Sequence, residues 1–85
     1  MYSLEEINSV AKEISGVEGV LATILFGSYA RGDFDEGSDV DLLVVFKDKK
    51  FVESGLEKSL KLRHVVPYSF KLYLSQLKNW KNPPP

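Results

Sequence analysis

Two small groups of residues near the middle of this 85-residue chain have the types and spacing to do chemistry together. Gly27 and Ser28 follow one apolar run, and Asp39 and Asp41 begin a second. Gly27 lacks a Cβ, so the chain can turn sharply there, and a helical turn that starts at Ser28 offers N–H groups and a hydroxyl to an anion such as phosphate. Asp39 and Asp41 lie two residues apart on a predicted strand, so both carboxylates leave the same face.

The two aspartates indicate a cation site. Aspartate is disfavoured in strands, and two carboxylates on one face repel each other unless a cation or proton lies between them. Mg²⁺ typically takes one or two carboxylates and completes its shell with water and substrate phosphate. A phosphate cradle beside such a metal pair is the minimum requirement for phosphoryl or nucleotidyl transfer, which predicts Asp39 and Asp41 as catalytic metal ligands. The competing interpretations are a pair of exposed strand-end acids and an ordinary strand–helix turn with a serine cap.

This pattern resembles the signature of the DNA polymerase β-type nucleotidyltransferase superfamily. Its residues are Gly27-Ser28, a spacer from Tyr29 to Ser38, and Asp39-Val40-Asp41 with apolar flanks, and the tight match covers about residues 24–46. The small size of the chain points to the minimal nucleotidyltransferase branch. The resemblance implies an α/β (α+β) fold with a small mixed sheet of about three to four strands and helices packed on it.

The resemblance also implies an Mg²⁺-dependent enzyme that uses a nucleoside triphosphate, for which ATP is our expectation, to modify a hydroxyl acceptor. Its candidate nucleotide-binding residues are Gly27, Ser28, Arg31 and Ser38. For Arg31 three interpretations stay open: a phosphate contact, a contact with a nearby carboxylate, or a solvated surface position. The branch resembles one half of toxin–antitoxin pairs in which a small nucleotidyltransferase modifies a helical HEPN-type protein, so we expect such a partner, with a homo-oligomer as a further option.

One expected residue is missing. The superfamily resemblance implies a third acid on the last strand, where it assists a second metal or takes the proton from the attacking hydroxyl. Residues 66–73 contain neither Asp nor Glu, and aligning the apolar flanks puts Lys71, or as second choice Ser69, in that place. The site then works with one metal, transfers slowly, or is inactive with the ammonium replacing the cation; a shifted alignment with Lys71 pointing away is the remaining option. The alternative function is therefore a catalytically degenerate module that neutralises or scaffolds a partner by binding.

Composition narrows the class of protein. Net charge is −1 and the sequence pI is about 5.8, which argues against a broad basic face, so nucleic acid is not expected as a direct partner. The chain has no cysteine and no apolar run long enough to span a bilayer, so we expect a cytoplasmic protein without a membrane contact. Its length predicts one domain over residues 1–82, followed by a frayed proline tail at 83–85.

The patterns around the motif predict the elements that position it. Residues 1–15 have the periodicity of an amphipathic helix, with Ser3 and Glu6 as a capping box. The continuous apolar run at 20–26 predicts a strand buried on both faces in the centre of the sheet. Further expected elements are a turn at 29–31, a strand to residue 46, a helix from 48 to 60, a strand at 65–74 and a last turn at 75–80.

Several polar residues have simpler explanations than catalysis. We interpret Asp33, Asp35 and Glu36 as solvated residues of a loop. We interpret His64 as a cation that the helix dipole favours near the carboxyl end of a helix. Gly55 is expected to weaken the helix that contains it.

Overall fold

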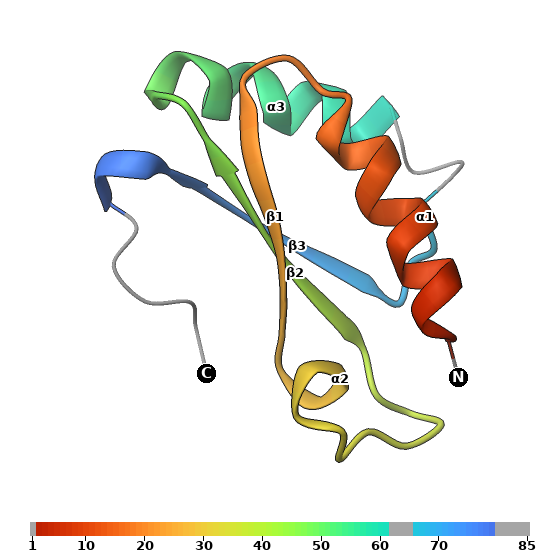
Figure 1. Cartoon of the computed structure of the whole chain (residues 1–85). Helices are drawn as coiled ribbons and strands as arrows, with labels where there is room; N and C mark the ends of the chain where they lie inside the picture. The colour runs from red at the N-terminus through yellow and green to blue at the C-terminus, as the bar shows by residue number, and fades with distance from the viewer. Residues whose placement is uncertain (1, 62–65, 80–85) are drawn as a thin grey trace.

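The computed structural model describes residues 2–61 and 66–79, and these form a sheet covered by helices on one face (Figure 1). In chain order the elements are α1 (Leu4–Ser15), β1 (Val20–Phe26), α2 (Ser28–Arg31), β2 (Val40–Phe46), α3 (Lys49–Lys61), β3 (Phe70–Gln76) and a 3-10 helix, η2 (Leu77–Asn79). Within the described residues the sheet has three strands in the order β1-β2-β3. β1 runs antiparallel to β2 and β3 runs parallel to it, which confirms the predicted α/β fold with a small mixed sheet.

The central strand is β2 and not β1, so the predicted central position of residues 20–26 is wrong. β1 lies at one edge of the sheet described here, and Leu21 is half exposed there. A continuous apolar run occurs at this edge because both faces of β1 still pack: Leu25 joins the helix-side core, and Phe26 lies in the cluster on the opposite face. β2, which pairs with a strand on each side, is the most buried strand.

The main core lies between the sheet and the two long helices. Alternate side chains of β2 point into it, as the period of two requires: Val40, Leu42, Val44 and Phe46. α1 covers this face with Ile7, Val10 and Ile14, and α3 adds partly buried Phe51 and Val52. The predicted orientation of β2 is thereby confirmed, and its remaining residues are directed to the face that carries the motif.

The start of α1 follows its sequence signals. The Ser3 hydroxyl oxygen accepts a hydrogen bond from the Glu6 N–H at 3.1 Å, as expected for an N-cap, and the Ser3 hydroxyl donates to the Glu6 carboxylate at 3.4 Å. The Tyr2 ring meets Phe70 at the start of β3 edge to face. α1 is therefore held at the end of the sheet where the Gly27-Ser28 turn lies.

Gly55 has a packing role that its helix propensity does not reveal. A Cβ at this position would overlap the ring of Phe46, which is almost completely buried in the main core. Glycine lets α3 approach β2 at that point, so a residue that is unfavourable in an isolated helix favours the packed domain.

The last strand begins later than predicted. β3 extends from Phe70 to Gln76. Pro67 lies in the turn before it, and the Pro67 carbonyl accepts a hydrogen bond from the Phe70 N–H. Ser75 lies inside this strand instead of capping a turn, and η2 follows at residues 77–79. Predictions for Met1, for residues 62–65 including His64, and for Trp80 and the proline tail lie outside the described residues. No helix among residues 2–61 and 66–79 is long and apolar enough to cross a membrane.

Candidate active site

The turn at Gly27 sets the shape of the site. β1 ends at Phe26, and Gly27 has φ 78° and ψ −156°, a conformation that is essentially restricted to glycine. A Cβ on Gly27 would overlap the Asp41 carboxylate oxygen Oδ2 and lie 3.2 Å from its Cγ. The backbone of the Gly-Ser turn and the second aspartate of the motif are therefore packed directly against each other, which sequence spacing alone does not show.

The short helix α2 begins at Ser28 and is tied to the rest of the domain. The N–H groups of Ala30 and Arg31 donate to the Gly27 carbonyl at 3.1 and 3.0 Å, and Gly32 ends the helix in a left-handed conformation. Ser28 is the first residue of this helix, so its hydroxyl and N–H lie at the amino end of the turn, next to Gly27.

A buried tyrosine anchors α2, and the sequence patterns did not single it out. The Tyr29 ring stacks on Phe34 with 4.2 Å between centroids, and its hydroxyl accepts a hydrogen bond from the Tyr2 N–H at 3.1 Å. Tyr29 belongs to the main core. Because α2 is only one turn long, these contacts connect it, and the Gly-Ser turn at its start, to α1 and the main core.

Asp41 occupies the middle of the sheet at the end where the turn lies. It pairs in register with Phe26 on β1 and with Lys71 on β3. Residues paired across neighbouring strands share a face, so these three side chains leave the sheet on the side opposite the main core. Phe26 is buried there with Leu43 and Val45, and this apolar cluster forms the floor beside the charged groups.

Lys71 holds the other aspartate. Its Nζ lies 3.1 Å from Asp39 Oδ2, with 57% of the lysine side chain and 42% of the aspartate side chain exposed. The hydrogen bond and the charge of Asp39 raise the pKa of Lys71, with smaller contributions from Tyr73 and Asp41, so the ammonium keeps its charge at neutral pH. Lys71, rather than Ser69, stands opposite Asp41, and the carbonyl of Ser69 accepts the N–H of Val40 at 2.9 Å.

Tyr73 is a further site residue that the sequence reasoning missed. Its hydroxyl donates to Asp41 Oδ1 at 3.4 Å, and its ring lies edge to face on Phe26 with 5.1 Å between centroids. The signal that identifies it is simple: Tyr73 is two residues beyond Lys71 on the same strand and so shares its face. Among the described residues, Tyr73 and Gly27 flank the two oxygens of one carboxylate.

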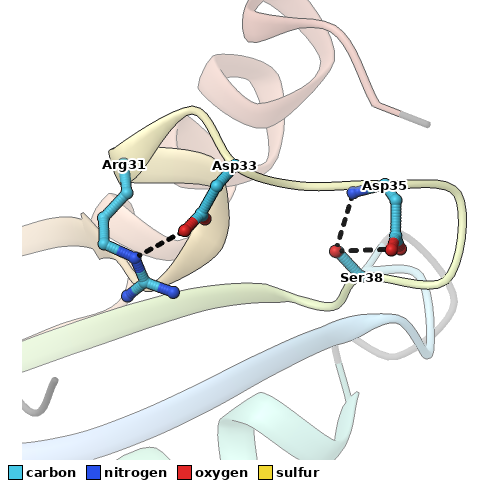
Figure 2. Close-up of polar contacts among 4 residues, drawn as sticks. All are labelled: Arg31, Asp33, Asp35 and Ser38. Atoms are coloured by element: carbon cyan, nitrogen blue, oxygen red, sulfur yellow. Dashed lines mark hydrogen bonds and ion pairs between the residues drawn. The ribbon is translucent and has the colours of Figure 1, made fainter.

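Two candidate residues, Arg31 and Ser38, contact aspartates of the connecting loop, Asp33 and Asp35 (Figure 2). The Arg31 Nε lies 3.3 Å from Asp33 Oδ2 in an ion pair that is exposed on both sides, which corresponds to the carboxylate contact among the three interpretations from the sequence. The Ser38 hydroxyl donates to Asp35 Oδ1 at 3.3 Å and accepts from the Asp35 N–H at 2.9 Å. Asp33 and Asp35 thus shape the loop, which is a more specific role than solvation.

The donor set suits a cation that arrives with its own ligands. Within the described residues no group of three or more carboxylate, imidazole or thiol side chains is gathered in one place. Asp39 and Asp41 offer two carboxylates on an accessible sheet face, which is the number that Mg²⁺ commonly takes from protein when phosphate and water complete its shell. The chemistry of the residues therefore fits Mg²⁺ bound to a triphosphate better than a structural metal ion.

A glycine-serine turn packed on Asp41, with Asp39 two residues before it, at one end of a small mixed sheet with helices behind it, is the arrangement expected of a nucleotide-transferring α/β domain. Comparison with known sequences agrees: the family described as "Nucleotidyltransferase domain" matches residues 4–82, and the chain belongs to this family.

Two similar proteins carry more specific names. A chain of Methanocaldococcus jannaschii named "Putative protein adenylyltransferase" is 40% identical over 73 residues, which cover 84% of this chain and 71% of the relative. "Protein adenylyltransferase MntA" of Thermococcus cleftensis is 44% identical over 73 residues, which cover 74% of each chain.

Proposed function

We propose that this protein transfers an adenylyl group from ATP to a hydroxyl group of a partner protein. The observation that carries the proposal is the contact between Gly27 and Asp41, which brings the phosphate-binding turn and the acidic pair into one site. The family assignment and the names of the two similar proteins support the same reaction class and a protein acceptor.

In the proposed reaction the acceptor hydroxyl oxygen attacks the α-phosphorus of ATP. The bond between the α-phosphorus and the oxygen that bridges to the β-phosphorus breaks, pyrophosphate leaves with that electron pair, and the hydroxyl proton passes to water. The chain contributes by alignment and charge: the turn at Ser28 holds the outer phosphates, and the acidic face orients the reacting end.

Asp39 and Asp41 would hold Mg²⁺, which neutralises phosphate charge in the bound nucleotide when present. Lys71 exchanges its contact from Asp39 to a phosphate oxygen as the nucleotide arrives. Because Lys71 is more than half exposed, this movement needs no rearrangement of the core. Arg31 lies three residues after Ser28 and would also contact a phosphate oxygen. It can leave Asp33 to do so, because that ion pair is exposed on both sides.

The acceptor is a second protein. The names of the two similar proteins support a protein acceptor, and the candidate site lies on the sheet face opposite the helix-side core. A helical partner of the HEPN type, modified on a tyrosine, is the acceptor class that the minimal-branch resemblance favours.

The test is a transfer assay with Mg²⁺, ATP labelled at the α-phosphate, and the product of the neighbouring gene. We expect label on the partner, loss of label with Asp41→Asn, and loss of label when EDTA removes the metal. Glu53→Gln is the control, because it removes an exposed carboxylate on α3, which packs on the face of the sheet opposite the candidate site. Equal labelling with Asp41→Asn and the control would refute the proposal.

The ion pair between Lys71 and Asp39 favours one second candidate function. An ammonium already neutralises part of the acidic pair, so a catalytically degenerate domain that binds its partner by contact alone is the alternative. Such a domain would bind the neighbouring gene product without transferring label, and the double change Asp39→Asn/Asp41→Asn would leave that binding unchanged.

A further inference from the structure

We propose that Lys71 serves as a built-in second cation, so that the protein binds its nucleoside triphosphate with one divalent metal ion instead of two. The inference rests on the proposed function and deepens it, because it assigns the metal content of the same site.

The position of Lys71 is the first support. It stands opposite Asp41 in the parallel pairing of β2 and β3, and its ammonium reaches Asp39 at 3.1 Å. A carboxylate at position 71 would leave the same face of the sheet, beside the same two aspartates. Lys71 therefore lies where a third acid would complete a site for a second metal ion, and it points toward the acidic pair instead of away from it.

Charge balance is the second support. A third carboxylate together with a second divalent cation adds one net positive charge to the site, and a lysine ammonium adds the same net charge. Replacing the acid and its metal by lysine thus leaves the electrostatic potential at the triphosphate site almost unchanged. Replacing the acid and its metal by a neutral residue would lower it. This equivalence of charge explains how this chain can keep the acidic pair and yet lack the third acid.

The remaining oxygen atoms are the third support. One oxygen of Asp39 contacts Lys71, and one oxygen of Asp41 accepts the Tyr73 hydroxyl. Lys71 moves to a phosphate oxygen when the nucleotide binds, which frees that oxygen of Asp39, and two carboxylates can then serve one Mg²⁺ together with phosphate and water, which is its usual protein share. A second dication would meet the ammonium of Lys71 at short range without an acid to offset the repulsion.

Mn²⁺ is a suitable probe because it replaces Mg²⁺ and reports its neighbours by electron paramagnetic resonance. The complete chain is titrated with Mn²⁺ in the presence of an ATP analogue with a methylene group between the α- and β-phosphates. We expect one bound Mn²⁺ per chain for the wild type, two magnetically coupled Mn²⁺ ions for Lys71→Asp, and one for Lys71→Met. Without nucleotide, we expect the Lys71→Met variant to bind Mn²⁺ roughly two- to five-fold more tightly than the wild type, because Asp39 no longer forms its exposed ion pair with Lys71.

Lys47→Asp is the matched control. Lys47 follows directly after β2 at the strand end opposite Asp41, is exposed, and changes the net charge equally. We expect it to bind one Mn²⁺, like the wild type. Circular dichroism verifies that each variant is folded, which is expected because more than half of the Lys71 side chain is exposed.

The outcomes separate this inference from the proposed function. A coupled Mn²⁺ pair in the wild type, or a single ion in folded Lys71→Asp, would overturn the role of Lys71 while leaving adenylyl transfer intact. Binding of neither the analogue nor Mn²⁺ by the wild type and all variants would instead contradict the proposed function itself.

Discussion

Gly27→Ala tests the contact on which the candidate site depends. Gly27 has positive φ, and the added Cβ would overlap Asp41 Oδ2. The carboxylate must then rotate away, and the hydrogen bond that Tyr73 donates to Asp41 is lost with it. The substitution therefore changes two properties, the free energy of unfolding and the affinity for nucleotide, through the same added methyl group.

Gly32→Ala is the control that separates these two effects. Gly32 also has positive φ, 84°, but a Cβ there would meet no atom within 4 Å. Its cost is backbone strain alone, roughly 1–2 kcal/mol for an alanine in the left-handed region. Gly27 has the rarer combination of φ and ψ, for which strain of about 1–3 kcal/mol is typical before the overlap is counted.

Urea unfolding and calorimetric titration with the methylene analogue of ATP and Mg²⁺ measure the two properties. We expect both variants to lower the free energy of unfolding, and only Gly27→Ala to weaken nucleotide binding, by at least about tenfold or 1.4 kcal/mol, since it displaces one of the two carboxylates. Equal nucleotide affinity in the two variants would show that the contact between Gly27 and Asp41 has no part in binding.

Two further predictions concern Lys71 and the packing of α3. The pKa of Lys71 is raised above its ordinary value of 10.5, first by the hydrogen bond to Asp39 and then by the charge of Asp39, so the ion pair stabilises the fold below about pH 10.5 and stops doing so as pH rises through the folded-state pKa. The difference in thermal unfolding midpoint between wild type and Lys71→Met should shrink over that range. A difference that persists at higher pH would contradict the ion pair as its cause. Gly55→Ala improves helix propensity but drives a methyl group into the ring of Phe46, so we expect a net destabilisation of about 1–3 kcal/mol in urea unfolding, and a stabilised variant would refute the packing role.

The motif could be found in the sequence because its signals are local. The glycine-serine turn after an apolar run, and two aspartates at the spacing of a strand, do not depend on the rest of the chain. The period of two also assigned Asp41 to the face opposite Val40 and Leu42, which the structure confirms, whereas Asp39 was predicted on the same strand and lies just before β2 begins at Val40. Local signals of this kind are set by backbone geometry, so they survive without knowledge of the packing.

Other features depend on which segments meet, and these could not be predicted. The apolar run of β1 does not distinguish an edge strand from a central one, because an edge strand can also pack on both faces. Tyr29 looked like an ordinary helix residue, and only the tertiary structure reveals that its ring stacks on Phe34 and that its hydroxyl joins α1 to α2. Gly55 looked unfavourable until the nearness of Phe46 gave it a reason.

The sequence by itself identified the candidate residues for chemistry: a turn suited to phosphate, a pair of acids, and a lysine where a third acid was expected. Tertiary structure decided how they relate, because the parallel pairing of β2 and β3 sets Lys71 opposite Asp41 and within reach of Asp39. That register is fixed by packing between strands distant in the chain, where a shift by one residue would turn Lys71 to the other face.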